Sequence, residues 1–480
     1  MIESPLLKNL GGYINGQWTP ADSGKTLTVT NPVDHSPLAE VAAMGTAETE
    51  RAIAAAEGAM TRPASLEQRR DWLNGIADAL TAEREEIGRI LCMEHGKPLA
   101  EAQGEVDYAA GFFRYAADQI DALAPRTLKE RPRDCSWTVH HRPAGVVGLI
   151  TPWNFPIGMI AKKLSSAIAA DCASVIKPSS KTPLTMIALF SLLDRKLDLP
   201  AGMVNLVMGS AGPITQALFD APSVRVISFT GSTEVGRELI RQAAPGVKRL
   251  TLELGGNAPY IIFEDADLEK AADQLIGNKF RGGGQTCVCA NRIFVHQDVA
   301  EAFAEKLATR VAELKVGDGM QPGINLGPLI DENAVAKVAR HVEDAVAKGA
   351  KKVFEGDTSG LAGTFHAPTV LLDVPENAAC YREETFGPLV PIITFGDEAE
   401  VVRMANDTDF GLACYVFTGN ESRGQQVISR LHFGHAALNT GSGPTPEAPF
   451  GGMKQSGYGR EGGLEGLFEF TEAQTVPVGA

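Results

Sequence analysis

The chain has 480 residues and a hydrophobic content of 44%, which suffices for a large core and normally divides into about two or three domains. Its formal net charge of −15 disfavours nucleic acid and anionic membrane lipid as partners, so an anionic ligand needs basic residues placed locally. There is no run of about 18 apolar residues and no basic N-terminal segment followed by an apolar one. We therefore expect no membrane span, no secretion signal and a cytoplasmic location.

The first hundred residues are predicted to be mainly helical after a short hairpin around the sequence YINGQW. Ser65 and Gln68 are spaced as a capping box before a long amphipathic stretch. The apolar residues that mark its buried stripe are Trp72, Leu73, Ile76, Leu80, Ile87 and Leu91.

From residue 146 onward, short apolar runs alternate with helical segments. The runs are VVGLI, ASVI, MVNLV and RVISF, and each ends in a turn rich in Gly, Pro or Ser. This alternation predicts a parallel, doubly wound sheet. After residue 250 the pattern begins again with LTLEL, APYIIF, a helix from about Leu268, RIFVH and a helix near residue 300, which predicts a second α/β domain.

Ligands of doubly wound sheets lie beyond the carboxyl ends of the strands, so the turns after the apolar runs are the first candidates for a site. In the first turn, TPWNFP at residues 151–156, Asn154 lies between Trp153 and Phe155, and two prolines stiffen the loop. An amide held in this way can donate to an oxyanion. The alternative is that Asn154 closes an Asx-turn.

The second turn is KPSSK, residues 177–181. It follows the strand at whose end an NAD enzyme of ordinary Rossmann type carries an acid for the ribose 2′-hydroxyl. No acid is present. Lys177, Ser179, Ser180 and Lys181 instead offer positive charge and hydroxyls that suit a 2′-phosphate, which favours NADP. The alternative is a solvated polar turn.

A later turn, FTGSTEVG at residues 229–236, places Gly231, Ser232 and Gly236 between a strand and a helix. Backbone amides and a helix N-terminus at such a place can hold a pyrophosphate. The spacing differs from the usual GxGxxG, so glycines of a structural turn are the alternative.

Two reactive residues follow in the sequences LELGG and GGGQTCVCAN. Cys287 lies in a loop of Gly, Gln and Thr, which is a poor place for core packing and a good one for nucleophilic attack. Glu253 lies between leucines, where a salt-bridged strand residue is the alternative to a catalytic carboxylate. Among seven cysteines only Cys287 and Cys289 are close in sequence, so we expect reduced thiols and no metal site.

Taken together with EETFGP around residue 384 and PFGGMKQSG near the C-terminus, these motifs resemble the aldehyde dehydrogenase superfamily over nearly the whole chain. GGNAP after Glu253 and GQTCVCANR are similar to its succinate-semialdehyde dehydrogenase branch. The resemblance implies an α/β fold with a Rossmann-type cofactor domain, a second α/β catalytic domain and a small β arm for oligomerisation. The implied boundaries are residues 1–121 and 144–253 for the cofactor domain, 254–447 for the catalytic domain, and 122–143 with 466–480 for the arm.

The resemblance also implies a mechanism. The Cys287 thiolate attacks the aldehyde carbon, and the Asn154 side chain and the Cys287 backbone amide hold the oxyanion. Water activated by Glu253 then hydrolyses the thioester to a free acid. The implied cofactor is NADP, with NAD as the alternative, and the implied contacts are Trp153, Lys177, Ser179, Ser180, Gly231, Ser232, Gly236, Glu384 and Phe386.

For the substrate, the resemblance implies succinate semialdehyde or a similar ω-oxo acid held by basic residues. Arg281 matches one arginine of that branch, Lys162 takes the place of the other, and Thr445 lies near the position of a serine. Alternatives are another acid semialdehyde, such as 2-oxoglutarate semialdehyde, or a neutral aliphatic or aromatic aldehyde. For Arg281 the alternative is a structural pair with an acid near the subunit surface.

Three further expectations remain. Cys289 is a candidate redox partner whose bridge to Cys287 would block the nucleophile. The arm strands predict a homodimer or homotetramer, because unpaired strand edges invite pairing between subunits. The competing functions are a thiol hydrolase, which would need a histidine base, and a catalytically silent binding protein on the same scaffold.

Overall fold

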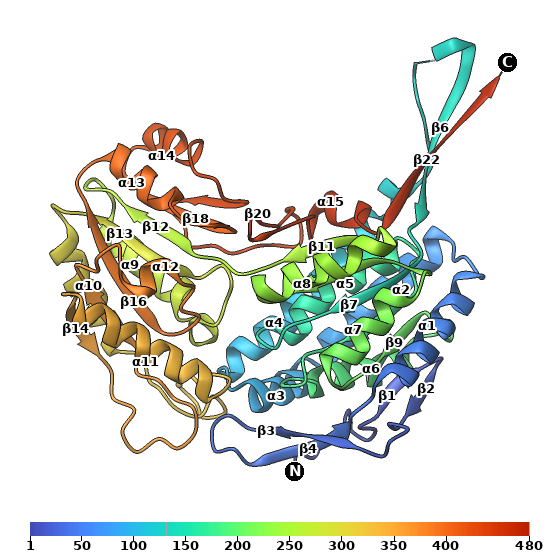
Figure 1. Ribbon diagram of the computed structural model, residues 1–480, viewed down its shortest axis with the longest axis horizontal. Helices are drawn as coiled ribbons and strands as arrows, with labels where there is room; N and C mark the ends of the chain where they lie inside the picture. The colour runs from blue at the N-terminus through green and yellow to red at the C-terminus, as the bar shows by residue number, and fades with distance from the viewer. Residues whose placement is uncertain (131, 480) are drawn as a thin grey trace.

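The computed structural model describes residues 1–130 and 132–479, so residues 131 and 480 of the predicted arm lie outside the described residues. It has two lobes, each built on its own sheet, and a strand arm that projects from one of them (Figure 1). Mixed α/β architecture is as predicted. No helix in the described ranges is long and apolar enough to cross a membrane.

The N-terminal hairpin is confirmed, with β1 (Gly12–Ile14) paired to β2 (Gln17–Thr19). A second hairpin, β3 (Thr26–Thr30) with β4 (Pro37–Ala42), was not predicted. The helices that follow are α1 (Thr46–Met60), α2 (Leu66–Ala82), α3 (Arg84–His95) and α4 (Leu99–Gln119). The Ser65 capping box is confirmed at the start of α2. The long amphipathic stretch that follows is divided between α2 and α3, because Glu83 between them has φ −106° and ψ 18°.

The four predicted runs form adjacent parallel strands of an eight-stranded sheet in the order β2-β1-β9-β8-β7-β10-β11-β21. These strands are β7 (Val146–Ile150), β8 (Ser174–Lys177), β9 (Val204–Leu206) and β10 (Val224–Thr230). Helices α5 (Pro156–Ala169), α6 (Leu184–Lys196), α7 (Ala211–Asp220) and α8 (Thr233–Ala243) connect or follow them. The strand order reverses between β7 and β10, which is where doubly wound sheets bind ligands.

The LTLEL segment does not open the second lobe. It forms β11 (Arg249–Glu253), which pairs in parallel with β10 and so completes the first sheet. The main chain enters the second lobe only after Glu253, and returns when β21 (Gly457–Tyr458) pairs with β11. Consequently Glu253 lies at the end of a strand of the first sheet, beside the loop that follows β10.

The second lobe contains a seven-stranded sheet in the order β14-β15-β16-β13-β12-β18-β19. Its strands are β12 (Ala258–Ile262), β13 (Ala290–His296), β14 (Lys351–Glu355), β15 (Thr369–Leu372), β16 (Leu389–Phe395), β18 (Ala413–Phe417) and β19 (His435–Leu438). The predicted helices are confirmed as α9 (Leu268–Lys279) and α10 (Ala300–Ala312). The others are α11 (Glu332–Ala347), α12 (Ala379–Arg382), α13 (Glu398–Asn406) and α14 (Glu421–Ile428).

Shorter elements link the lobes and form the arm. β17 (Phe410–Gly411) pairs with β20 (Met453–Lys454), and α15 (Gly463–Phe468) leads into the last strand. The arm is an antiparallel sheet of β5 (Arg126–Thr127), β6 (Cys135–Pro143) and β22 (Thr471–Gly479), and it extends away from both lobes (Figure 1). That the arm pairs between subunits stays a prediction, as do the domain boundaries.

Gly236 shows how tightly α8 packs on the first lobe. A Cβ atom at this position would lie 2.6 Å from the two Cδ atoms of Leu254. We expect Gly236→Ala to lower the thermal denaturation midpoint, because overpacking costs about 1–3 kcal/mol. Gly104→Ala is the matched control, since Gly104 also lies within a helix but a Cβ there would meet no atom of another segment within 4 Å. That substitution should leave the midpoint unchanged or raise it. Equal midpoints for the two variants would contradict the packing argument.

Candidate functional site

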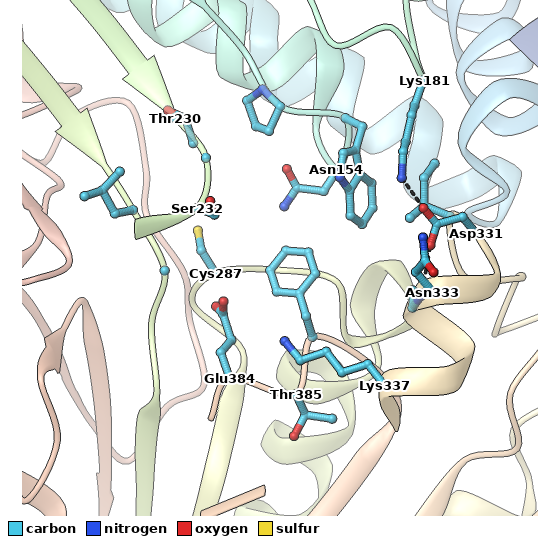
Figure 2. Close-up of a pocket in the computed structure, with 18 of the residues that line it drawn as sticks. Asn154, Lys181, Thr230, Ser232, Cys287, Asp331, Asn333, Lys337, Glu384 and Thr385 are labelled. Carbon is cyan, nitrogen blue, oxygen red and sulfur yellow. Dashed lines mark hydrogen bonds and ion pairs between the residues drawn. The ribbon is translucent and has the colours of Figure 1, made fainter. Parts of the chain in front are cut away.

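A cavity of about 350 Å³ lies between the two lobes, and we call it the larger cavity. The first lobe contributes the loops after β7 and β10, with Asn154 and Ser232, and the second contributes Cys287, Glu384 and residues of α11. In Figure 2 the side chains of Asn154, Cys287 and Glu384 face the same open space. Five of the nine predicted cofactor residues line it: Trp153, Gly231, Ser232, Glu384 and Phe386.

A second, narrow cavity of about 20 Å³ shares Cys287 with the larger one, and we call it the smaller cavity. Glu253, Lys162, Arg281 and Glu461 line it together with aromatic side chains. Cys287 therefore forms part of the wall of both cavities. Asn154 and Glu253 lie at the carboxyl ends of strands of the first sheet, whereas Cys287 precedes its strand, β13, in the second. The amino ends of the second sheet therefore meet the carboxyl ends of the first at this site.

Asn154 is buried, and its side-chain Nδ2 donates to the Gln285 carbonyl at 2.9 Å. This bond ties the loop after β7 to the loop that carries Cys287. The Asx-turn alternative fails, because its donor would be the N–H of residue 156, which is a proline. The amide has a second N–H, and Asn154 lines the larger cavity with Cys287. The geometry thus fits an oxyanion donor.

Cys287 is half-buried in a loop whose backbone packs closely against the segment that leads into β12. A side chain at Gly256 would bring a Cβ to 2.5 Å from the Cys287 carbonyl oxygen, so only glycine fits there. Burial raises the pKa of the Cys287 thiol to about 12, and the nearby Lys162 ammonium only partly offsets this. Formation of the attacking thiolate that the resemblance implies is therefore helped by a nearby proton acceptor.

Glu253 is buried, and one of its carboxylate oxygens has no hydrogen-bond partner. Burial and the neighbouring Glu461 carboxylate raise its pKa well above the ordinary value. A carboxylate with a raised pKa is a stronger base than a solvated one. The alternative of a salt-bridged strand residue is not what the structure contains, because among the described residues no ion pair within 4.0 Å involves Glu253.

Glu461 was missed by the sequence analysis. It is buried, forms an ion pair with Lys163 and lies 3.8 Å from Lys162. The only sequence signal for a role of Glu461 in the site was its place just after the PFGGMKQSG motif. Its pairing with the lysines could not be predicted, because both lie some 300 residues away in the chain. Lys162 is thus engaged by an acid of the protein, and its amine lies 4.6 Å from the centre of the Phe450 ring.

On the larger cavity, the Glu384 carboxylate accepts a hydrogen bond from the Gly256 amide at 3.0 Å. Burial raises the pKa of Glu384 to about 7. Phe386 has φ +57°, a strained backbone for a residue that is not glycine, and its ring meets Trp153 edge to face at 5.7 Å. The cavity therefore combines aromatic walls with one fixed carboxylate.

The loop after β10 needs a correction. The Gly231 amide donates to the Glu253 carbonyl at 3.0 Å, and the Gly236 amide donates to the Ser232 carbonyl at 3.0 Å. Neither amide is free for a phosphate. The Ser232 side chain caps α8 by accepting from Val235 N at 3.3 Å. What this loop presents to the larger cavity is the N-terminal end of α8.

The KPSSK turn lies apart from most of the larger cavity. Lys177 is buried, its amine donates to the Pro178 carbonyl at 3.0 Å, and burial lowers its pKa to about 8. Ser179 accepts from the Lys181 amide, and Ser180 is exposed. Lys181 does line the cavity, where it forms an ion pair with Asp331 of the second lobe (Figure 2). Asp331 and, from α11, Asn333 and Lys337 also line the cavity but were not predicted, because nothing in their local pattern differs from a solvated helix.

The predicted substrate residues separate into two groups. Arg281 lines the smaller cavity with its guanidinium 4.7 Å from the centre of the Phe155 ring, and no ion pair in the described ranges joins it to an acid. The structural-pair alternative therefore finds no support within this chain. Thr445 is a correction, because it is exposed, lines neither cavity and donates its hydroxyl to Glu447. Pro444 takes its place on the cavity wall.

Cys289 is buried and lines neither cavity. Its thiol donates to the Gly284 carbonyl at 3.3 Å, and the Lys279 amine lies 3.8 Å from its sulfur. A bridge to Cys287 would require this thiol to leave both partners. The redox role of Cys289 stays a prediction.

Comparison with known proteins places this site in a family. The aldehyde dehydrogenase family matches residues 18–476. A glutarate-semialdehyde dehydrogenase of Pseudomonas putida is 47% identical over 462 residues, covering 96% of each chain, and an NADP(+) succinate-semialdehyde dehydrogenase of Escherichia coli is 45% identical over 468 residues, covering 97% of each. A solved structure of an oxidoreductase from Marinobacter aquaeolei is 61% identical and superposes with a TM-score of 0.98 over the whole of both chains. The chain therefore belongs to the aldehyde dehydrogenase family of enzymes.

Proposed function

We propose that this enzyme oxidises an ω-oxo acid, succinate or glutarate semialdehyde, to the dicarboxylic acid with NADP as the hydride acceptor. The observation that carries the proposal is the position of Cys287 in the wall of both cavities. One cavity has the features of a cofactor site, and the other has a general base and a free guanidinium. The competing thiol hydrolase has less support, because no histidine lines either cavity in the described residues.

The larger cavity fits a nicotinamide nucleotide. The Trp153 and Phe386 rings, which meet edge to face, give it an aromatic wall for a planar base, and the fixed Glu384 carboxylate can accept from ribose hydroxyls. The Thr230 hydroxyl is buried in its wall without a partner. The bound cofactor supplies the hydride acceptor. NADP is favoured over NAD because the turn after β8 offers lysines and serines and no acid for a 2′-hydroxyl.

In the proposed reaction the Cys287 sulfur bonds to the aldehyde carbon and its proton passes to Glu253. The oxyanion accepts from the free N–H of the Asn154 amide and from the Cys287 amide. Loss of hydride leaves a thioester on Cys287. Glu253 then releases its proton to solvent and removes one from the attacking water. That proton passes to the departing Cys287 sulfur, so the acid leaves as the thiol is restored.

Substrate choice follows from the smaller cavity. Its narrowness and its aromatic side chains favour a slender, unbranched chain over an aromatic aldehyde. Arg281 is free to bind the distant carboxylate, whereas Lys162 already faces Glu461. The two relatives bear the names of glutarate- and succinate-semialdehyde dehydrogenases, and these two semialdehydes are ω-oxo acids of adjacent lengths.

The test is a comparison of kcat/KM for succinate semialdehyde, glutarate semialdehyde, hexanal and benzaldehyde, each with NADP and with NAD. We expect one of the two acids to exceed both neutral aldehydes by about 10- to 100-fold, because a charged hydrogen bond is worth about 1.5–3 kcal/mol. Arg281→Met should remove most of this preference and leave the rate with hexanal unchanged. A tenfold preference for NAD, or for hexanal, would overturn the corresponding part of the proposal.

A further inference from the structure

A buried ion pair lies outside both cavities, next to the loop that carries Asn154. Lys97 occupies the turn between α3 and α4, and Glu105 lies on α4. Both side chains are 1% exposed, and their charged atoms are 2.6 Å apart. Because both charges lose their water, such a pair contributes little net stability compared with apolar side chains of the same size. Its presence here calls for another physical reason.

Lys97 holds the Asn154 loop directly. Its ammonium donates to the Asn154 carbonyl oxygen at 2.7 Å and lies 3.9 Å from the centre of the Phe155 ring. The turn of Lys97 is itself fixed, since its backbone amide donates to His95 Nδ1 at 3.2 Å. One buried cation therefore contacts two successive residues of the loop.

Glu105 holds the other end of the same loop. Helix α5 begins at Pro156, and Phe155 at its N-cap has no side-chain acceptor for the first free amides. Glu105 Oε1 supplies one from a different helix, accepting from Ile157 and Gly158 at 3.1 Å each. Its other oxygen accepts from Lys97. The pair thus fixes the main chain on both sides of Asn154.

We propose that Lys97 and Glu105 are positioning residues, which set the place of the Asn154 amide relative to Cys287. The inference rests on the proposed oxyanion role of Asn154. With the main chain fixed and Nδ2 bonded to the Gln285 carbonyl at 2.9 Å, little freedom remains for the amide. A displacement of about 1 Å in such a donor can cost about 100-fold in rate.

The test is a double-mutant cycle with Lys97→Met and Asn154→Ala, assayed with succinate semialdehyde and NADP. We expect Lys97→Met alone to lower kcat by about 10- to 100-fold while the Kd for NADP changes less than about twofold. In the Asn154→Ala background the same substitution should lower kcat less than about twofold further, because the donor that it positions is already absent. Glu105→Gln keeps an acceptor for the α5 amides but removes the charge facing Lys97, so it should give a smaller loss in the same direction.

Lys248→Met is the matched control. Lys248 is also buried and donates to two backbone carbonyls, those of Ala221 and Val224, but it lies away from both cavities. This variant should keep kcat. An equal loss from Lys97→Met in both backgrounds, an unchanged kcat, or failure of both Lys97→Met and Glu105→Gln to fold would overturn the inference. Full activity of Asn154→Ala would instead overturn the proposed oxyanion role, and the inference with it.

Discussion

Cys287→Ala is expected to lower kcat for aldehyde oxidation by more than about 10⁴-fold while the Kd for NADP stays within about twofold. The sulfur is the only nucleophile proposed for the carbonyl carbon, and alanine removes it without adding bulk to either cavity. Steady-state production of reduced cofactor measures the rate, and fluorescence titration with NADP measures binding.

Cys289→Ala is the matched control for this experiment. Its thiol is two residues away but donates to the Gly284 carbonyl and lines neither cavity. We expect its kcat to stay within about threefold of the unmodified enzyme, because the substitution removes only two weak hydrogen bonds, those with Gly284 and Lys279. Comparable losses in the two variants would mean that the loop, and not the Cys287 sulfur, is required.

Glu253→Gln is expected to lower kcat at neutral pH by about 10²- to 10⁴-fold, the usual contribution of a positioned general base. Glutamine keeps the size of the side chain but cannot accept the proton from the thiol or from water. Rapid mixing of enzyme with aldehyde and NADP separates the two steps, since the first produces reduced cofactor and the second releases the acid.

The two enzymes should also differ in how kcat depends on pH. In the unmodified enzyme kcat should rise with pH as Glu253, whose pKa burial has raised, loses its proton. In Glu253→Gln the rise of kcat that follows the ionisation of Glu253 should vanish. The rate of the first turnover should then keep rising with pH toward the thiol pKa of about 12, because the thiol ionises without help. A Glu253→Gln profile that parallels the original would show that another group is the base.

Much of the fold could be predicted because its signals are local. Alternation of apolar runs with helical segments predicted the parallel strands from β7 to β10, and the Ser65 capping box predicted the start of α2. Strand β4 escaped because its apolar residues do not alternate with polar ones, and β3 because it offers only two apolar positions, Leu27 and Val29. The break at Glu83 escaped because no proline or glycine marks it.

The sequence by itself determined which chemical groups this enzyme has: a cysteine in a loop unsuited to core packing, an amide between prolines, a glutamate after a strand and a turn without an acid. The tertiary structure alone decided their states and partners. Burial raises the pKa of the Cys287 thiol, Lys162 is matched by Glu461, Thr445 lies outside both cavities, and Lys97 with Glu105 holds the Asn154 loop. The reason is physical. The pKa of a group and the partner of a charge depend on burial and on neighbours, and here those neighbours come from segments as far apart as α4, α5 and the region after β21.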